Sequence, residues 1–324
     1  MTTAPPAPES PGPERPAPAR LRPSRTSLTA VAIVLVLGTF WGLALSVAKT
    51  ASQAGVPPIG YAFWQATGAG LVLLAIGWAR GRPPPLDRRT LRYGLFMGAI
   101  GMAIPNAVSF TVLTQVPAGA MAVVINMVPL IAYGLALAVR DETFQPRRLA
   151  GVLVGLCGAL LLVLPGTSLP EPSMALWLLF GMLTPTLYAV SVIGGARWRP
   201  DGVPSLALAT GMLLSAGTVL LPVVLATGTF YLPDPANLHV GDLALAGQIA
   251  ITSTMFFLYF ELLRLGGPIM ASLVGYTVTL AGIVWGMILF GERHSAFLWA
   301  AVALIFAGLA LVQGGRRKAP APGD

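Results

Sequence analysis

The sequence predicts an all-α integral membrane protein with ten transmembrane helices, arranged as two inverted five-helix repeats. Three observations predict this fold: the composition, ten apolar segments of membrane-spanning length, and an internal repeat. The chain has 324 residues, of which 55% are hydrophobic and only 10% are charged, and its mean hydropathy is +0.76. Because about a quarter of the residues in soluble domains are charged, this chain cannot fold around one water-soluble core.

Ten segments are long and apolar enough to cross a bilayer, which takes about 20 residues per helix. They are roughly 28–49, 59–79, 92–114, 117–139, 148–165, 174–195, 204–227, 243–264, 268–290 and 296–314. The loops between them are too short to hold a second domain. Residues 1–27 are rich in Pro, Ala and Arg, and we expect a disordered cytoplasmic tail there, with a basic cytoplasmic tail over 315–324.

The distribution of positive charge predicts the orientation. With ten spans and a cytoplasmic N-terminus, 18 of the 20 Lys and Arg residues fall on the cytoplasmic side, and only Lys49 and Arg293 fall outside. This bias follows the positive-inside rule and predicts a multi-pass protein of the cell (inner) membrane with both termini cytoplasmic. It also accounts for the net charge of +8 through topology and contact with anionic lipid, so we expect no nucleic-acid partner.

An internal repeat divides the chain in two. With a shift of 150, residues 109–164 lie over 259–314, and identical pairs include Glu142 with Glu292 and Gly158 with Gly308. The halves, 28–165 and 174–314, then hold five spans each. Because five is odd, the second half enters the membrane from the opposite side, which makes the repeats inverted. Inverted repeats are typical of transporters that open a central site to each side in turn.

Several motifs carry a family resemblance over both halves. They are Thr39-Phe40-Trp41-Gly42 with Lys49, Met127-Val128-Pro129-Leu130 followed by Glu142, and Val278 through Phe290-Gly291-Glu292-Arg293. This pattern resembles EamA-domain proteins of the drug/metabolite transporter superfamily. The resemblance implies export of a metabolite or amino acid, with uptake or exchange of other organic solutes as the alternative. Gln65 stands where the family usually has Arg, so charge-based recognition is not implied for this chain.

Polar residues inside spans mark the interior of a bundle, because polar groups are costly in hydrocarbon unless they are paired or face water. Several fall on single helix faces and predict a central cavity. The candidate solute-binding residues are Trp41, Lys49, Gln65, Asn106, Asn126, Tyr188, Gln248, Thr252, Tyr259 and Tyr276. The alternative is that such groups only form hydrogen bonds from helix to helix. Prolines inside four spans, at 105, 129, 185 and 222, predict kinks.

Two charged residues lie furthest inside the predicted spans. Lys49 could attract an anionic group of a solute, or its ammonium group could reach the outer headgroups. Glu261 could carry a proton, or it could pair with Arg264, three residues further along the same helix.

The sequence argues against an enzyme, because it contains no HExxH, P-loop or GxSxG motif. The two histidines, His239 and His294, fall in outer loops without metal-ligand spacing, and the single cysteine is Cys157. We therefore expect no catalytic residue, no metal and no cofactor. The expected partners are the bilayer and a small solute. A cavity of amides, hydroxyls and aromatic rings favours a neutral or zwitterionic solute, because a polyanion would need several cations. The oligomeric state is left open.

Overall fold

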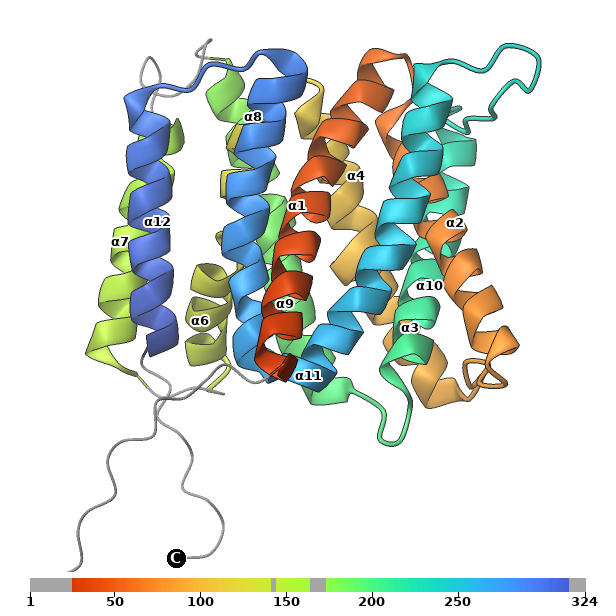
Figure 1. Cartoon of the computed structure of the whole chain (residues 1–324), viewed down its shortest axis with the longest axis horizontal. Helices are drawn as coiled ribbons and strands as arrows, with labels where there is room; N and C mark the ends of the chain where they lie inside the picture. The colour runs from red at the N-terminus through yellow and green to blue at the C-terminus, as the bar shows by residue number, and fades with distance from the viewer. Residues whose placement is uncertain (1–24, 141–143, 164–172, 315–324) are drawn as a thin grey trace, which may run out of the picture.

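The chain folds as a bundle of helices packed side by side (Figure 1). The structure is a computed structural model that describes residues 25–140, 144–163 and 173–314. Most of the expected N-terminal tail, the C-terminal tail and Glu142 therefore lie outside the described residues. Residues 25–27, at the end of the expected N-terminal tail, begin the first helix. The elements are α1 (Arg25–Gln53), α2 (Pro58–Ala79), α3 (Arg88–Gly98), the π-helix η1 (Ala99–Ala103), α4 (Ile104–Leu113), α5 (Ala118–Ile125), α6 (Val128–Ala138), α7 (Pro146–Val163), α8 (Met174–Gly181), α9 (Leu183–Trp198), α10 (Ser205–Ala226), α11 (Val240–Phe290) and α12 (Ala296–Gly314).

Eight helical segments within the described residues are long and apolar enough to cross a membrane. They are Leu28–Gln53, Pro58–Ala79, Arg88–Leu113, Ala118–Ala138, Met174–Trp198, Ser205–Ala226, Val240–Tyr259 and Leu273–Phe290. The remaining two expected spans correspond to α7 and α12. The apolar part of α12, Ala296–Val312, is shorter than the eight segments above. The all-helical membrane fold is therefore established, while the count of ten spans stays a prediction.

Three of the spanning segments are interrupted near a proline. Pro105 lies in the first turn of α4 after the π-helix, and Pro129 lies in the first turn of α6. Pro185 lies in the first turn of α9, just after the break at Met182. The first turn of a helix tolerates proline because its N–H groups have no partner within the helix. By contrast, α10 continues through Pro222.

Helix α11 contains two expected spans, 243–264 and 268–290, as one continuous hydrogen-bonded element of 51 residues. Both of its apolar stretches pack against α1. The ring of Trp41 lies 6.0 Å from that of Phe256 in the first stretch. Gly42 approaches the second stretch so closely that a Cβ there would lie 2.7 Å from the backbone nitrogen of Gly282. The two stretches stand on either side of α1 and meet at the end of the bundle where α1 begins (Figure 1).

Helices α7 and α12 cross at small residues. A Cβ built on Gly308 would lie 2.5 Å from the carbonyl oxygen of Gly151, and one built on Gly158 would lie 2.9 Å from that of Ala301. Along these contacts the residue numbers rise on α7 as they fall on α12, so the two helices are antiparallel. Small residues allow such close helix contact in membranes.

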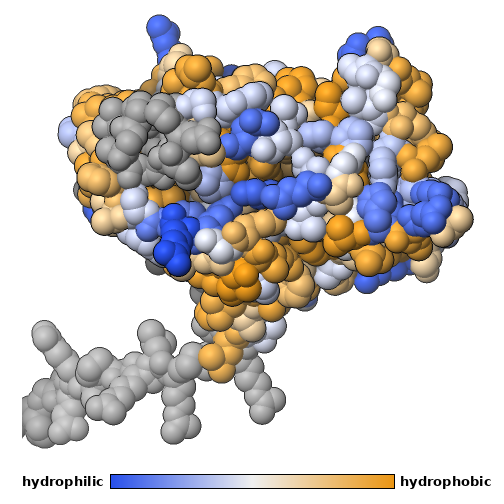
Figure 2. Space-filling model, turned by 90° about the horizontal axis from the view of Figure 1, so that it is seen from above, coloured by the Kyte–Doolittle hydropathy of each residue, from blue (hydrophilic) through white to orange (hydrophobic). Residues whose placement is uncertain are grey.

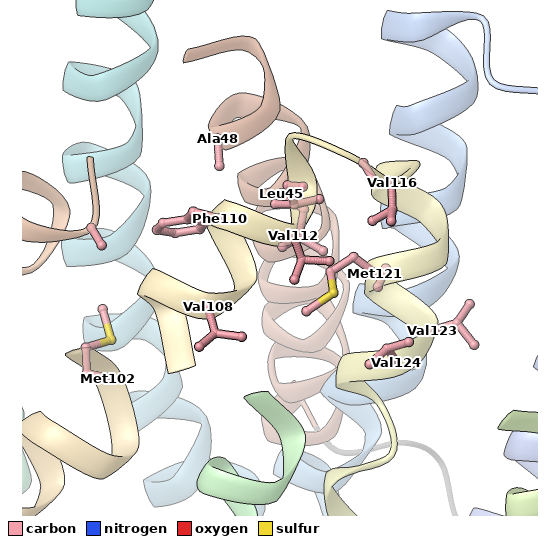
Figure 3. Close-up of a cluster of buried hydrophobic side chains, with 14 of the residues drawn as sticks. Leu45, Ala48, Met102, Val108, Phe110, Val112, Val116, Met121, Val123 and Val124 are labelled. Carbon is pink, nitrogen blue, oxygen red and sulfur yellow. The ribbon is translucent and has the colours of Figure 1, made fainter. Parts of the chain in front are cut away.

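Apolar side chains fill the bundle where α1, α4 and α5 meet (Figure 3). Val112 and Met121 are fully buried there. Because lipid tails are as apolar as these side chains, close van der Waals packing holds the helices together in the membrane rather than escape from water. Leucines on the outer faces, such as Leu160 and Leu176, are exposed and are free to contact lipid.

Candidate functional site

A chain of four hydrogen-bonded polar side chains crosses the interior of the bundle. Gln65 donates from Nε2 to the hydroxyl of Thr252 over 3.0 Å. Asn106 donates from Nδ2 to Oε1 of Gln65, also over 3.0 Å, and Tyr188 donates from its hydroxyl to Oδ1 of Asn106. The four residues come from α2, α11, α4 and α9, which belong to both halves of the chain. All four are among the candidates from the sequence.

Helix α4 holds Asn106 in the chain of polar groups. Asn106 follows Pro105 in the first turn after the π-helix, and its Nδ2 also lies 3.4 Å from the sulfur of Met102 in that π-helix. The hydroxyl of Thr184, at the start of α9, donates to the carbonyl of Pro105 over 3.1 Å. This bond ties α9 to α4 one turn from Tyr188. The interrupted helices thus meet at the polar chain.

Further polar atoms next to this chain are buried without a partner. Three such atoms are Oε1 of Gln248, the hydroxyl of Ser109 and the hydroxyl of Tyr61, which have no hydrogen-bond partner among the described residues. Gln248 is only 2% exposed and lies one turn before Thr252 on α11. Because a buried polar atom without a partner costs free energy, these atoms favour a water molecule or a solute beside the polar chain.

Asn126 and Tyr276 lie elsewhere, between the second stretch of α11 and neighbouring helices. Asn126 ends α5 at the break before α6. Its Oδ1 faces Gly275, where a Cβ would lie 2.8 Å away, and its Nδ2 has no partner among the described residues. The Tyr276 ring packs edge-on against Phe306 of α12, with centroids 4.8 Å apart.

Trp41 and Tyr259 pack against each other. Their ring centroids are 5.6 Å apart, at the contact between α1 and the first stretch of α11. Glu261 follows on α11 and is partly buried. The side chain of Arg264, its expected partner, lies outside the described residues.

Lys49 forms a buried ion pair at the end of the bundle where α1 ends. Its Nζ lies 2.8 Å from Oε1 of Glu292, and the two side chains are only 15% and 8% exposed. The same carboxylate accepts from the backbone N–H groups of Ala118 and Gly119, over 2.8 and 3.3 Å. These groups open α5, so the anion also meets the positive end of the helix dipole. The ammonium group of Lys49 is therefore already paired with a carboxylate of the protein.

His294 completes this cluster. Its side chain is 3% exposed, and its Nε2 lies 3.5 Å from Oε2 of Glu292 without a hydrogen bond. Burial lowers the pKa of the imidazole and Lys49 lowers it further, while Glu292 opposes them. Viewed from above, this end of the molecule shows a band of hydrophilic residues between hydrophobic margins (Figure 2). Sequence reasoning identified Lys49 but not its ion pair with Glu292.

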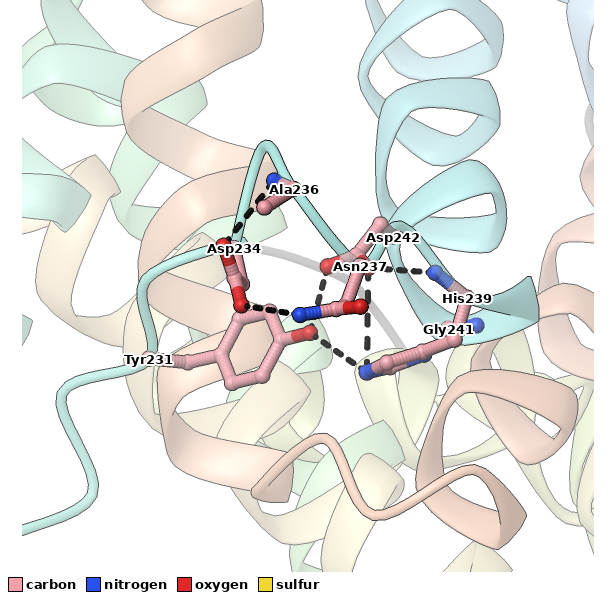
Figure 4. Close-up of polar contacts among 7 residues, drawn as sticks. All are labelled: Tyr231, Asp234, Ala236, Asn237, His239, Gly241 and Asp242. Atoms are coloured by element: carbon pink, nitrogen blue, oxygen red, sulfur yellow. Dashed lines mark hydrogen bonds and ion pairs between the residues drawn. The ribbon is translucent and has the colours of Figure 1, made fainter.

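A second polar cluster that the sequence did not reveal lies in the loop before α11 (Figure 4). Tyr231 donates from its hydroxyl to Asp242, and that hydroxyl also lies 3.0 Å from Nε2 of His239. His239 and Asp242 cap α11 reciprocally. Burial and Asp242 raise the pKa of Tyr231 to about 12. The cluster fixes the start of α11 and gives this loop a structural role.

Metal ligands do not gather in the part of the chain that the structure describes: no group of three or more His, Cys, Asp or Glu residues lies close enough to hold an ion.

Comparison with known proteins identifies the family. The model of the EamA-like transporter family matches residues 28–164 and 175–313. The chain belongs to the EamA-like transporter family. A relative, the inner membrane transporter YedA of Escherichia coli K12, is 30% identical over 82% of this chain and 84% of its own length. Protein PecM of Dickeya dadantii is 26% identical over 67% of this chain and 72% of its own.

A solved crystal structure has a similar fold, with a TM-score of 0.57 and 21% sequence identity over 88% of this chain and 96% of that one. The family membership and the spanning helices together make this EamA protein a membrane transporter and not an enzyme.

Proposed function

We propose that this EamA protein is an alternating-access transporter that moves a small neutral or zwitterionic metabolite, such as an amino-acid-like solute, out of the cytoplasm across the cell membrane. The observation that carries the proposal is the buried chain Thr252–Gln65–Asn106–Tyr188. It joins helices of both halves in the middle of the bundle. In transporters built from two repeats, the solute site typically lies at the interface between them.

The contact between α7 and α12 supports ten spans in two inverted repeats, 28–165 and 174–314. Under the shift of 150, the contact of Gly151 with Gly308 becomes a contact of Ala301 with Gly158, and the structure contains both. Equivalent helices that exchange their contacts and run antiparallel are related by a two-fold axis perpendicular to both. For spanning helices, such an axis lies in the membrane plane, as inverted repeats require.

The position of the chain ends supports the proposed topology. The start of α1 and the end of α12 lie at the same end of the bundle (Figure 1), as an even number of spans requires. The arginine-rich loops belong at this end too, so the positive-inside rule favours cytoplasmic termini.

The polar groups support a neutral or zwitterionic solute. The hydrogen-bonded chain contains amides and hydroxyls and no ionised group. Gln248 offers an unpaired acceptor beside it, and Asn126 offers an unpaired donor at the neighbouring break. Lys49 does not provide a site for an anion in this conformation, because Glu292 neutralises it. A phosphate or polyanion would need several free cations.

Export is proposed because the family resemblance implies it, and uptake or exchange is the alternative. The test is an untargeted metabolite profile of medium and cytoplasm from cells that express the wild type or single variants. Gln65→Ala should abolish the shift of solute into the medium, because it removes both the hydrogen bond from Asn106 and the hydrogen bond to Thr252. Thr252→Ala removes one hydrogen bond and should slow export about fivefold.

The matched control is Thr218→Ala, because Thr218 is exposed on α10 and its hydroxyl donates to the backbone carbonyl of Leu214 in the same helix. It should export like the wild type. Normal export by both Gln65→Ala and Asn126→Ala, at equal expression, would refute the proposed site. A shift of solute into the cells would replace export by uptake.

A further inference from the structure

An arginine-lined pocket lies at the end of the bundle where α3 begins and α9 ends. Its volume is about 440 Å³, and its lining consists of Arg88, Arg89, Arg92, Tyr93, Phe96, Arg197 and Trp198. Four of the seven lining residues are thus arginines. The pocket lies outside the hydrogen-bonded residues that we assign to solute, which include Asn106 on α4 and Tyr188, ten residues before Trp198 on α9.

The positive charge of this pocket is only partly neutralised. Arg89 lies 3.4 Å from the carboxylate of Asp201, in a pair that is 65% and 93% exposed. Asp87 caps α3 by accepting from the backbone of Arg89 and from Thr90. Within the described residues, neither Arg88 nor Arg92 has a carboxylate partner. Exposed pairs are weak, so an excess of positive charge remains available to an anion.

Three aromatic side chains, Tyr93, Phe96 and Trp198, also line the pocket. Phe96 and Trp198 pack edge to face, with centroids 4.8 Å apart, and Tyr93 donates to the carbonyl of Gly195 over 3.3 Å. Gly194 lets the ring of Phe96 approach α9, because a Cβ there would lie 2.6 Å from the ring. These contacts hold α3 and α9 together.

An exposed apolar side chain lies next to the pocket on the side toward the middle of the bundle. Leu95 lies one turn beyond Arg92 on α3 and is 51% exposed. The Trp198 ring is also exposed, as is typical of tryptophan at the level of the headgroups. Cations at the end of the bundle, next to an apolar surface that faces the membrane, match a lipid. A soluble phosphate compound would match the cations alone.

We propose that this pocket binds the phosphodiester headgroup of an anionic phospholipid. The guanidinium groups of Arg88 and Arg92 bind the phosphate, since planar guanidinium groups match its oxygens. The acyl chains lie along Leu95 and the exposed ring of Trp198. The bound lipid bridges α3 and α9, the first of which leads into the π-helix before Asn106 and the second of which carries Tyr188.

The test is native mass spectrometry of the full chain in detergent, titrated with dioleoylphosphatidylglycerol or with dioleoylphosphatidylcholine. The wild type should bind phosphatidylglycerol at least tenfold more tightly than phosphatidylcholine. Arg92→Gln should lower that affinity about fivefold, the effect of one cation near an anionic lipid. The matched control is Arg82→Gln, which removes an exposed arginine from the neighbouring loop, outside the pocket, and should change the affinity less than twofold.

Two results would overturn the proposal. Both Arg92→Gln and Arg82→Gln must first elute as folded protein in size exclusion. One contradicting result is then that Arg92→Gln loses no more affinity for phosphatidylglycerol than Arg82→Gln does. The other is full displacement of the lipid by millimolar glycerol phosphate, which would assign the pocket to a soluble phosphate compound.

Discussion

The Glu292 carboxylate should be a main stabilising contact at the end of the bundle where α1 ends. It binds Lys49 over 2.8 Å and accepts two backbone N–H groups that open α5. Removing one partner of a fully buried ion pair costs about 3–5 kcal/mol, whereas an exposed pair contributes about 0–1 kcal/mol. With side chains 15% and 8% exposed, we expect Glu292→Gln to cost about 2 kcal/mol, between those limits.

The assay is thermal unfolding of the purified protein in detergent. A loss of about 2 kcal/mol should lower Tm by about 4–8 °C. Arg293→Gln is the matched control, because Arg293 is adjacent and exposed, and it should leave Tm within about 1 °C of the wild type.

A double-mutant cycle with Lys49→Met separates the ion pair from the helix cap. Lys49→Met/Glu292→Gln should be less destabilised than the sum of the two single variants, because the double variant buries no unpaired ammonium group. Strictly additive effects, or a Tm for Glu292→Gln equal to that of the control, would refute the reasoning.

Three further predictions follow from the same contacts. Burial lowers the pKa of His294, so the folded state resists protonation of its imidazole. The free energy of unfolding should therefore be highest above the unfolded pKa of about 6.5 and should decline as the pH falls below it. His294→Gln should show a smaller drop in Tm between pH 7.5 and pH 5.5, and an equal drop would contradict this. Gly308→Ala should cost about 1–3 kcal/mol, because its Cβ would lie 2.5 Å from a backbone oxygen; Gly134→Ala, which meets open space, is the control in the same Tm assay. Glu261→Gln should keep transport and its pH dependence near wild type, and a lost pH dependence would make Glu261 a proton carrier.

The sequence predicted the membrane fold because hydrocarbon imposes a strong rule on composition: each span must be apolar over its whole length. It also placed Gln65, Asn106, Tyr188 and Thr252 on interior faces of their helices. It could not predict that these four bond in one chain, because the pairing depends on how α2, α4, α9 and α11 cross. Whether they bind solute remains a prediction.

Contacts between distant segments were beyond the sequence. Lys49 and Glu292 are separated by 243 positions, and no local periodicity joins them. Prolines 105 and 129 indicated where spans break, since proline is tolerated in a first helical turn. Pro185 follows the break at Met182 in the same way, whereas Pro222 shows that proline alone does not break a membrane helix.

Accessibility of position 248 from the two sides of the membrane tests alternating access most directly, and it requires no knowledge of the solute. Gln248→Cys would be made in a Cys157→Ala background, which removes the single native cysteine. Membrane-impermeant thiol reagents would then be applied to right-side-out and to inside-out vesicles. The account predicts that Gln248→Cys reacts from both sides, while Thr218→Cys on the outer face of α10 reacts from neither. Reaction of Gln248→Cys from one side only, or from neither, would contradict it.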